Sequence, residues 1–592
     1  MRAATQVQAL RTGVGVLAGL TEKLNVSLVF FVSVMAVLAY LTLGPLIFLV
    51  WDSFHPGWEF GDETAFTLAS YTKVLWDKRF VEMIVNTVIY GLGATALAVG
   101  LGSIFAWLVE RTNMPFRNVI YALLFAPIAI PGLVFAISYI LLLSPDIGVL
   151  NHLVMKLFGL KEAPFNVYTL PSLIFIEGLR LTPGSFLMMA AVLKSMDPSL
   201  EEAAYTTGAG VLRTARLITT PLMLPGILAA FIYYFITVIE SFEVPAIIAL
   251  PVGLQLLTTK IFFATHTTTQ MPQYSVAAAI SIIFILLSAG LVYLYTVATK
   301  HSEKFTTITG KGYRPRIIDL GKWRYAALAF TAAFFSFSVI FPLLVLVWGS
   351  LLPYLQPPSL AALTNASFES YFKVGQLPKF GLALKNTLFV TFIVATGTML
   401  LSSLAAWFVV RGRIRGGRYM DLLSFLPHAI PSIVVAVGLI ILYLNRYIRL
   451  MMPIYGTIWI IIVGMITKRI SYGSRIMIGA MFQLHKELEE ASEVCGVGWL
   501  KTFCLITVRL LVPAFVNGWL YSAMLSIALF TIPVMLYTPR SIVFSVLIWN
   551  LWENSKVQDA CVVGVLMVAI TFTLVFLGQY FASRARVQET LS

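Results

Sequence analysis

A polar stretch that occurs twice constrains the fold of this chain more than any other feature. Glu201–Pro225 reads EEAAYTTGAGVLRTARLITTPLMLP, and Glu489–Pro513 reads EEASEVCGVGWLKTFCLITVRLLVP. Twelve of the 25 aligned positions are identical, and the second copy starts 288 residues after the first. Because chance does not reproduce such a spacing, the chain is an internal duplication, and its two halves are expected to share one fold.

The composition places both halves in a membrane. Hydrophobic residues make up 59% of the 592 residues and charged residues only 11%, and a membrane-spanning helix needs ~20 apolar residues. Twelve segments qualify: 27–51, 84–109, 118–143, 170–194, 224–250, 275–299, 325–351, 385–410, 420–444, 455–481, 514–537 and 560–582. Only helices fit such continuous apolar runs. The sequence therefore predicts an all-α membrane protein with about 12 transmembrane helices in two homologous six-helix halves.

The apolar runs divide the chain into five parts. We expect a polar tail over 1–26, a first domain over 27–299, a basic linker over 300–324, a second domain over 325–583 and a C-terminal tail over 584–592. Matched prolines, Pro127 with Pro427 and Pro131 with Pro431, predict a broken helix at the same place in each half, since proline interrupts helices. Such breaks line a pathway in many transporters, but a packing kink is an equal alternative. Between these prolines and the repeat, the first half gains twelve residues, which we place in the loop 144–169.

The distribution of charge predicts the orientation. The net charge is +14, and basic residues gather in alternate loops, such as 110–117 and 411–418, whereas the segment 52–83 is acidic. Since lysine and arginine favour the cytoplasmic side, both termini and both repeats are expected in the cytoplasm. With no basic domain and no base-stacking motif, the charge does not indicate nucleic-acid binding.

The repeated stretch itself predicts a short surface helix. Asp197, Pro198 and Ser199 can start it, acidic residues suit its first turns, and Gly208 ends it after about three turns. Its Glu-Ala-Ala face is small and flat, which suits docking in a groove of another protein. The alternative is an ordinary cytoplasmic loop that contains a helix. This alternative is reasonable for a single copy, but two matched copies make it much less favoured.

The first repeat contains Glu-Ala-Ala, followed by three residues, Gly208, nine residues and Ile218, with a proline after it. This spacing resembles the EAA loop of the permease subunits of binding-protein-dependent ABC importers. Both halves carry it, and the resemblance covers nearly the whole chain. The fused two-domain layout is similar to ferric-iron permeases, a layout that thiamine permeases share, and 241–259 resembles the ferric-iron subgroup. The second copy departs at Glu493 and Arg509, where the first has Tyr205 and Pro221, which questions whether the two loops dock identically.

This resemblance implies a multi-pass protein of the bacterial inner membrane that takes a small solute from a periplasmic binding protein and imports it by alternating access. It implies that two ATP-binding cassette subunits dock on the two EAA loops, 201–225 and 489–513, and supply ATP hydrolysis. The implied docking residues are Glu201, Glu202, Ala203, Ala204, Gly208, Glu489, Glu490, Ala491 and Gly496. Ferric iron is the expected solute, and thiamine, a polyamine or another small polar solute is the alternative.

Charges inside the predicted spans suggest a polar pathway between the halves. Glu177 and Arg180 are three residues apart, as are Glu240 and Glu243, so each pair is expected on one helix face. Arg180 aligns with Lys468 of the second half. Buried charges are costly in a membrane and tend to face a cavity or a partner. Internal salt bridges are an equal alternative, with Arg180 as a candidate partner of the two glutamates.

No catalytic constellation accompanies these features. The sequence contains no GxxxxGK[ST] loop, so we expect no enzyme activity and no cofactor in this chain, with ATP on partner subunits. Its three cysteines and six histidines form no metal-binding motif. An ATP-independent secondary transporter and a membrane enzyme or scaffold remain as alternatives. The former needs no docking loops, and the latter needs a catalytic cluster.

Overall fold

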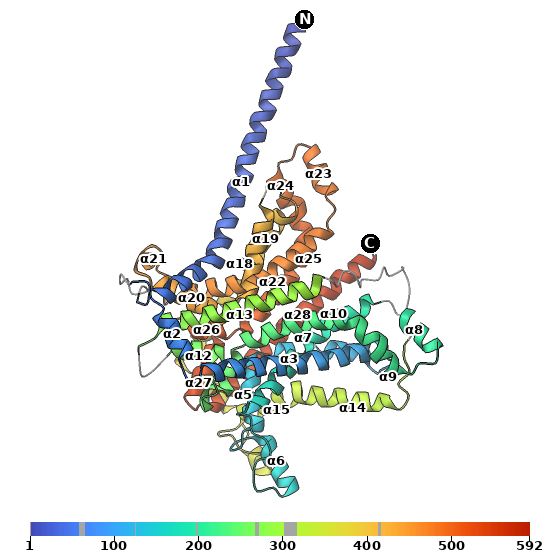
Figure 1. Ribbon diagram of the computed structural model, residues 1–592, viewed down its shortest axis with the longest axis vertical. Coiled ribbons are helices and arrows are strands. Elements are labelled where there is room, and N and C mark those ends of the chain that lie inside the picture. The colour runs from blue at the N-terminus through green and yellow to red at the C-terminus, as the bar shows by residue number, and fades with distance from the viewer. Residues whose placement is uncertain are drawn as a thin grey trace.

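The protein is almost entirely helical in a computed structural model, which describes residues 2–57, 65–124, 126–196, 199–266, 271–300, 317–412 and 416–591. Across these ranges β-pairing is limited to one isolated bridge between Thr112 and Ile318. Figure 1 shows the long helices packed side by side in one bundle. The prediction of an all-α fold is confirmed.

The helices of the first half follow the predicted order. They are α1 (Arg2–Phe54), α2 (Ala69–Leu75), α3 (Phe80–Arg111), α4 (Arg117–Leu123), η2 (Ala126–Ala129), α5 (Gly132–Leu143), α6 (Val149–Phe158), α7 (Leu170–Ser195), α8 (Ser199–Thr206), α9 (Val211–Thr214), η3 (Ala215–Thr219), α10 (Thr220–Glu240), α11 (Glu243–Ile248), η4 (Leu250–Val252), α12 (Leu257–Thr265) and α13 (Tyr274–Lys300).

The second half repeats this order. Its helices are α14 (Trp323–Phe335), η6 (Ser336–Ile340), α15 (Phe341–Leu351), α16 (Leu360–Thr364), α17 (Glu369–Gly375), α18 (Pro378–Val410), α19 (Gly417–Phe425), η7 (Leu426–Ala429), α20 (Ser432–Leu444), α21 (Arg446–Met451), α22 (Ile458–Gln483), α23 (Glu487–Val494), α24 (Trp499–Thr502), η8 (Phe503–Thr507), α25 (Val508–Ala528), α26 (Thr531–Leu536), α27 (Phe544–Glu553) and α28 (Val557–Leu591).

Nine helices in the described parts are long and apolar enough to cross a membrane, or up to eleven if each of two bent pairs is one span. The bent pairs are 117–129 with 132–143 and 417–429 with 432–444, at 93° and 106°. They break at the matched prolines, as predicted. The remaining expected segment, 455–481, corresponds to α22, whose 26 residues include Lys468, Arg469 and Arg475. These three charges explain why α22 is not among the nine helices that are apolar enough to cross a membrane.

The first span of each half packs on the other half, which interlocks the two. Helix α1 lies against α20, and α15 lies against α5. The Tyr40 and Tyr443 hydroxyls are 2.5 Å apart, and Tyr139 Oη donates to the carbonyl of Phe337 at 2.8 Å. Gly438 lets the backbone of Pro45 approach, since a Cβ there would lie 2.6 Å from the Pro45 carbonyl oxygen. Small residues at such contacts are typical of packed membrane helices.

The predicted tails and linker are only partly described. Helix α1 begins at Arg2, so residues 2–26 of the predicted polar tail are helical and continuous with the first span. The C-terminal segment likewise continues α28 to Leu591. Of the linker 300–324, residues 301–316 lie outside the described residues. Helix α6 lies in the loop 144–169 that was expected to hold the extra residues, and the corresponding helix α21 is shorter.

Candidate functional site

Each repeated stretch contains the short helix that the sequence predicts. These are α8, at the right edge of Figure 1, and α23, above the middle of the bundle, and both lie away from α2 and α27 on the left. After each helix a glycine takes the left-handed conformation, Gly208 at φ +82° and Gly496 at φ +77°. Glycine is the usual residue at this position after a helix because a side chain there is strained. Asp197 and Pro198 lie outside the described residues.

The two glutamates of each repeat have different environments. Glu490, Ala203 and Ala491 are exposed, and Glu202 is partly exposed. Glu201, however, is buried, with its Oε2 3.1 Å from Nε of Arg111. The corresponding distance from Glu489 to Arg411 is 3.3 Å. The Glu201 side chain is therefore turned away from the predicted docking surface, whereas that of Glu489 is partly exposed, and docking on these helices stays a prediction. Neighbouring positions of a helix differ by about 100°, so the first glutamate turns inward where the second turns outward.

Within the bundle, Glu177 and Arg180 form the predicted ion pair on α7. Arg180 donates through Nε to Oε2 at 2.9 Å and through a terminal nitrogen to Oε1 at 2.5 Å. Glu177 is fully buried. This two-bond geometry matches a planar guanidinium with a carboxylate, which is the strongest common arrangement for such a pair.

Glu240 finds its partner in the other half of the protein. Lys468 Nζ on α22 lies 2.9 Å from Oε2 of Glu240 at the end of α10. The same ammonium donates to the carbonyls of Ile430 at 2.8 Å and Pro427 at 3.4 Å, where the backbone breaks before α20. The lysine thus satisfies carbonyls freed by the proline break and joins the two halves through one buried charge. Arg180, the candidate partner from sequence, pairs with Glu177 instead.

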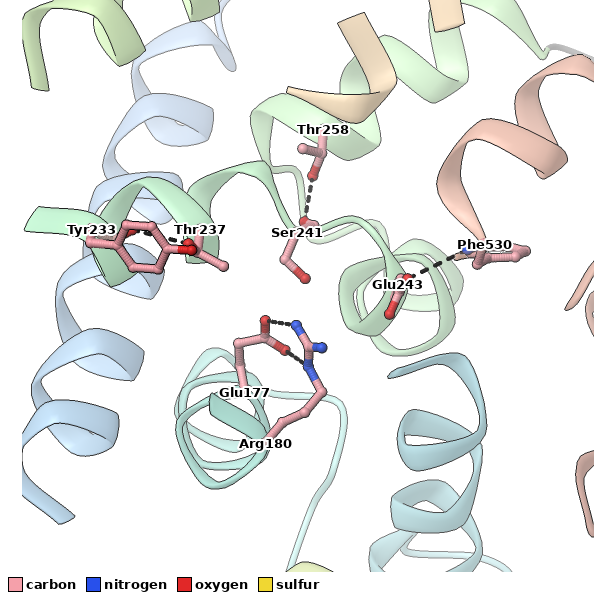
Figure 2. A network of polar contacts seen from close by, with 8 residues as sticks. All are labelled: Glu177, Arg180, Tyr233, Thr237, Ser241, Glu243, Thr258 and Phe530. Atoms are coloured by element: carbon pink, nitrogen blue, oxygen red, sulfur yellow. Dashed lines mark hydrogen bonds and ion pairs between the residues drawn. The ribbon is translucent and has the colours of Figure 1, made fainter. Parts of the chain in front are cut away.

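Glu243 is separate from Glu240, so the prediction that both share one helix face is wrong. Helix α10 ends at Glu240, Ser241 is extended, and α11 begins at Glu243. Glu243 Oε1 accepts a hydrogen bond from the backbone N–H of Phe530 in the second half at 3.4 Å. Figure 2 shows Glu243 and the Arg180 guanidinium pointing toward the same space beside Ser241. A Cβ on Gly132 would collide with the Glu243 carboxylate, so any larger residue there would force that carboxylate to move.

Sequence reasoning missed a matched aromatic pair between the halves. The rings of Phe242 and Phe530 stack with centroids 6.0 Å apart and an interplanar angle of 1°, and both are fully buried. They are 288 residues apart, and each precedes a proline by three positions, Pro245 and Pro533. That repeated spacing could have identified the two phenylalanines as equivalent residues from the sequence alone. It places equivalent residues of the two halves in direct contact.

Further polar and aromatic side chains lie one to two helical turns along α10 and α22 from the Glu240–Lys468 pair. The Tyr233 ring stacks on His428 with centroids 5.4 Å apart, and the Tyr472 ring meets the same histidine edge-on. Arg469, buried on α22, donates to the carbonyl of Leu525 at 2.6 Å. The described residues contain no group of three or more His, Cys, Asp or Glu side chains that could hold a metal ion.

Two stretches of the chain, 98–301 and 397–588, match the family model described as "Binding-protein-dependent transport system inner membrane component". The ferric transport system permease protein FbpB of Actinobacillus pleuropneumoniae is 24% identical over 569 residues, 94% of this chain and 78% of that protein. The Fe(3+)-transport system permease protein FbpB 2 of Haemophilus influenzae is 22% identical over 525 residues, 87% of this chain and 93% of that protein.

Among solved structures, a bacterial ABC transporter involved in the import of the acidic polysaccharide alginate is 20% identical to this chain. It covers 44% of this chain and 94% of its own, with a TM-score of 0.36.

Proposed function

This chain belongs to the family of binding-protein-dependent transport system inner membrane components, as a fused two-domain permease of an ABC importer, and we propose that the solute it imports is ferric iron. One observation carries the proposal. The similarity to ferric permeases extends through both halves and the connection between them, over 94% of this chain for one relative and 87% for another. The putative 2-aminoethylphosphonate permease PhnU of Salmonella typhimurium, in contrast, covers only 45% of this chain.

We propose that ATP is hydrolysed on separate subunits that dock on α8 and α23. Two matched helices, each ended by a left-handed glycine and each presenting an alanine to solvent, support two docking positions. Glu202, Ala203, Ala204 and Gly208 form one surface, and Glu490, Ala491 and Gly496 form the other. A periplasmic binding protein delivers the solute on the opposite side, and both termini lie in the cytoplasm.

We propose that the solute passes between the halves, where Glu243, the Glu240–Lys468 pair and the Glu177–Arg180 pair lie. The Glu240–Lys468 pair spans the two halves at 2.9 Å, so the halves cannot separate there without breaking it. Within the described part of the chain Glu243 accepts one hydrogen bond, from the backbone N–H of Phe530, and forms no ion pair, so its carboxylate is the acidic group best suited to meet a cation. Hard cations such as Fe³⁺ favour oxygen ligands.

Uptake in cells tests the substrate. A strain lacking this permease is given radioactive ferric iron, thiamine or 2-aminoethylphosphonate in separate assays, with and without the intact gene restored. We expect only the uptake of iron to depend on the gene. If iron uptake is unchanged and one of the other solutes is lost, the substrate is wrong while membership of the importer family stands. ATP depletion should abolish the uptake, whereas an ATP-independent secondary transporter would continue.

A further inference from the structure

A buried arginine at the end of one span in each half holds the docking loop from within. Arg111, the last residue of α3, is 3% exposed. Its Nε lies 3.1 Å from Oε2 of Glu201 on α8, a contact off the N–H direction and so an ion pair more than a hydrogen bond. A terminal nitrogen donates to the carbonyls of Leu193 at 3.0 Å and Met196 at 3.5 Å, where α7 ends.

The other oxygen of the same glutamate is also bound. Thr219 donates through Oγ1 to Oε1 of Glu201 at 2.6 Å, and this contact is buried. Thr219 is the last residue of η3, a turn of π-helix that leads into α10. Single π turns inside helices are rare and occur often at functional sites. Arg111, Glu201 and Thr219 therefore connect α3, α7, α8 and the start of α10.

The second half repeats the arrangement contact by contact. Arg411 lies 3.3 Å from Oε2 of Glu489 and donates to the carbonyls of Leu484 at 2.5 Å and Met481 at 3.5 Å. Thr507, the last residue of the π turn η8, donates to Oε1 of Glu489 at 2.7 Å. Each of these five residues aligns with its counterpart at an offset of 288 or, for the arginine, 300. We call each set of Arg, Glu and Thr a clamp.

The clamp is better suited to holding its helices in one arrangement than to raising the stability of the folded protein. A buried ion pair contributes little net stability over an apolar replacement of the same shape, but it holds its partners in one arrangement. The guanidinium is planar and presents several donors at fixed angles, so one arginine can bind a carboxylate and two carbonyls together. A lysine, with one point charge on a flexible stem, cannot reproduce that set of contacts.

We infer that Arg111–Glu201–Thr219 and Arg411–Glu489–Thr507 are positioning residues that make each docking helix move as one body with the spans on either side of it. The inference rests on the proposed function, because it concerns how motion of a docked ATP-binding subunit reaches the membrane. Glu202 and Glu490 meet the partner, and the preceding glutamates fasten the same helices to the bundle. Without the clamp the docking helix tilts under the partner and the spans do not follow.

A spin label on a native cysteine tests the clamp in the permease alone. Cys495 directly follows α23 and is exposed, as is Cys504, whereas Cys561 is buried. In a Cys504→Ser background, a label on Cys495 reports the mobility of the second docking loop. We expect a more mobile line shape in Glu489→Gln and in Arg411→Met, partial recovery in Arg411→Lys, and no change in the control Glu487→Gln, an exposed residue of the same helix. Unchanged line shapes in the first two variants would overturn the inference.

The same variants are then measured in the complete importer, reconstituted with its ATP-binding subunit and binding protein. We expect Glu489→Gln to keep the ATP-binding subunit bound but to lower uptake per ATP hydrolysed on the order of 2- to 30-fold, the range typical of mutations in coupling networks. Arg411→Lys should recover part of this loss. A looser docking loop with unchanged uptake per ATP would overturn the inference. If no ATP-binding subunit associates with the wild-type permease, the proposed function fails instead, and the mobility result still decides whether the clamp exists.

Discussion

At the scale of single residues, three acidic side chains that lie within 67 positions of each other have three different environments. Glu177 has an arginine on its own helix, Glu240 has a lysine from the other half, and Glu243 has a backbone N–H. Helical spacing alone predicted the first pair. The second could not be predicted, because the approach of Lys468 depends on how the halves assemble. The prediction that Glu240 and Glu243 share one helix face is wrong because the helix ends between them.

These environments predict different effects of neutralisation. Arg180→Met strands the fully buried Glu177, and Glu240→Gln strands the buried Lys468, so each should lower stability by ~3–5 kcal/mol. Glu243→Gln leaves both ion pairs intact, so it should lower uptake while the melting temperature stays close to wild type. Uptake and thermal unfolding of the purified permease are measured side by side.

The exposed Glu162→Gln is the control, and neither quantity should change in it. Normal uptake in Glu243→Gln and Glu240→Gln would remove both carboxylates from the pathway. Normal uptake with a lowered melting temperature in Glu240→Gln would leave that ion pair a purely structural role.

At the scale of elements, the docking helices and the proline breaks were predictable because both depend on local rules. Glycine after a short polar helix and proline within an apolar run act over a few residues. The inward turn of Glu201 and Glu489 was not predicted, because it depends on an arginine about 80 to 90 positions earlier in the chain. The sequence predicted the two short helices, and the structure shows that the two glutamates at the start of each one face in different directions.

Reversing the outward charges tests docking. Glu202→Lys combined with Glu490→Lys should abolish ATP-driven uptake and association with the ATP-binding subunit, while the permease still inserts, because a charge that attracts the partner becomes one that repels it. The two single variants are expected to differ in severity, since the loops differ at Tyr205 and Glu493. Co-purification and uptake are the measurements, and a double variant with full uptake would remove these helices from the ATPase interface.

The contact between α1 and α20 makes a separate stability prediction. A Cβ at Gly438 meets the carbonyl oxygen of Pro45 at 2.6 Å and two further Pro45 atoms at 2.9 and 3.0 Å. Gly438→Ala should therefore destabilise the permease by ~1–3 kcal/mol, the usual cost of overpacking. Gly100→Ala is the matched control, because nothing lies within 4 Å of a Cβ there. Equal melting temperatures for the two variants would contradict the close approach.

At the scale of the whole molecule, the first span of each half packs on helices of both halves, so the two form one unit although the sequence shows two. The duplication and the apolar runs predicted two six-helix halves. They did not predict that α1 packs on the second half and α15 on the first, because apolar runs carry no information about their partners. The clamps and the stacked phenylalanines follow the duplication closely, whereas the acidic residues of the interface are confined to the first half.

The orientation of the bundle is open to direct labelling. In a background with Cys495 and Cys504 replaced by serine, Lys322→Cys at the end of the linker should react with an impermeant thiol reagent only from the cytoplasmic side. Lys161→Cys, in the long loop of the first half, should react only from the periplasmic side. Both positions are exposed. The opposite pattern would move both docking loops to the periplasm and exclude cytoplasmic ATPases as partners.

The stacked pair at the interface makes the last prediction. Phe242 and Phe530 are equivalent residues in direct contact, and Glu243, next to Phe242, accepts a hydrogen bond from the backbone N–H of Phe530. If the solute passes between the halves, these two positions must separate in each cycle. Phe242→Cys with Phe530→Cys, joined by a short bis-methanethiosulfonate that forms a disulfide with each thiol, should stop uptake while ATP-binding subunits remain bound, and reduction of these disulfides should restore uptake.

Each single cysteine variant treated with the same reagent is the control for modification of one position. Restored uptake after reduction separates a locked interface from a misfolded protein. Full uptake in the cross-linked permease would show that the halves do not part at this contact. The pathway would then have to lie away from Glu243 and the Glu240–Lys468 pair, since both are held by the same interface.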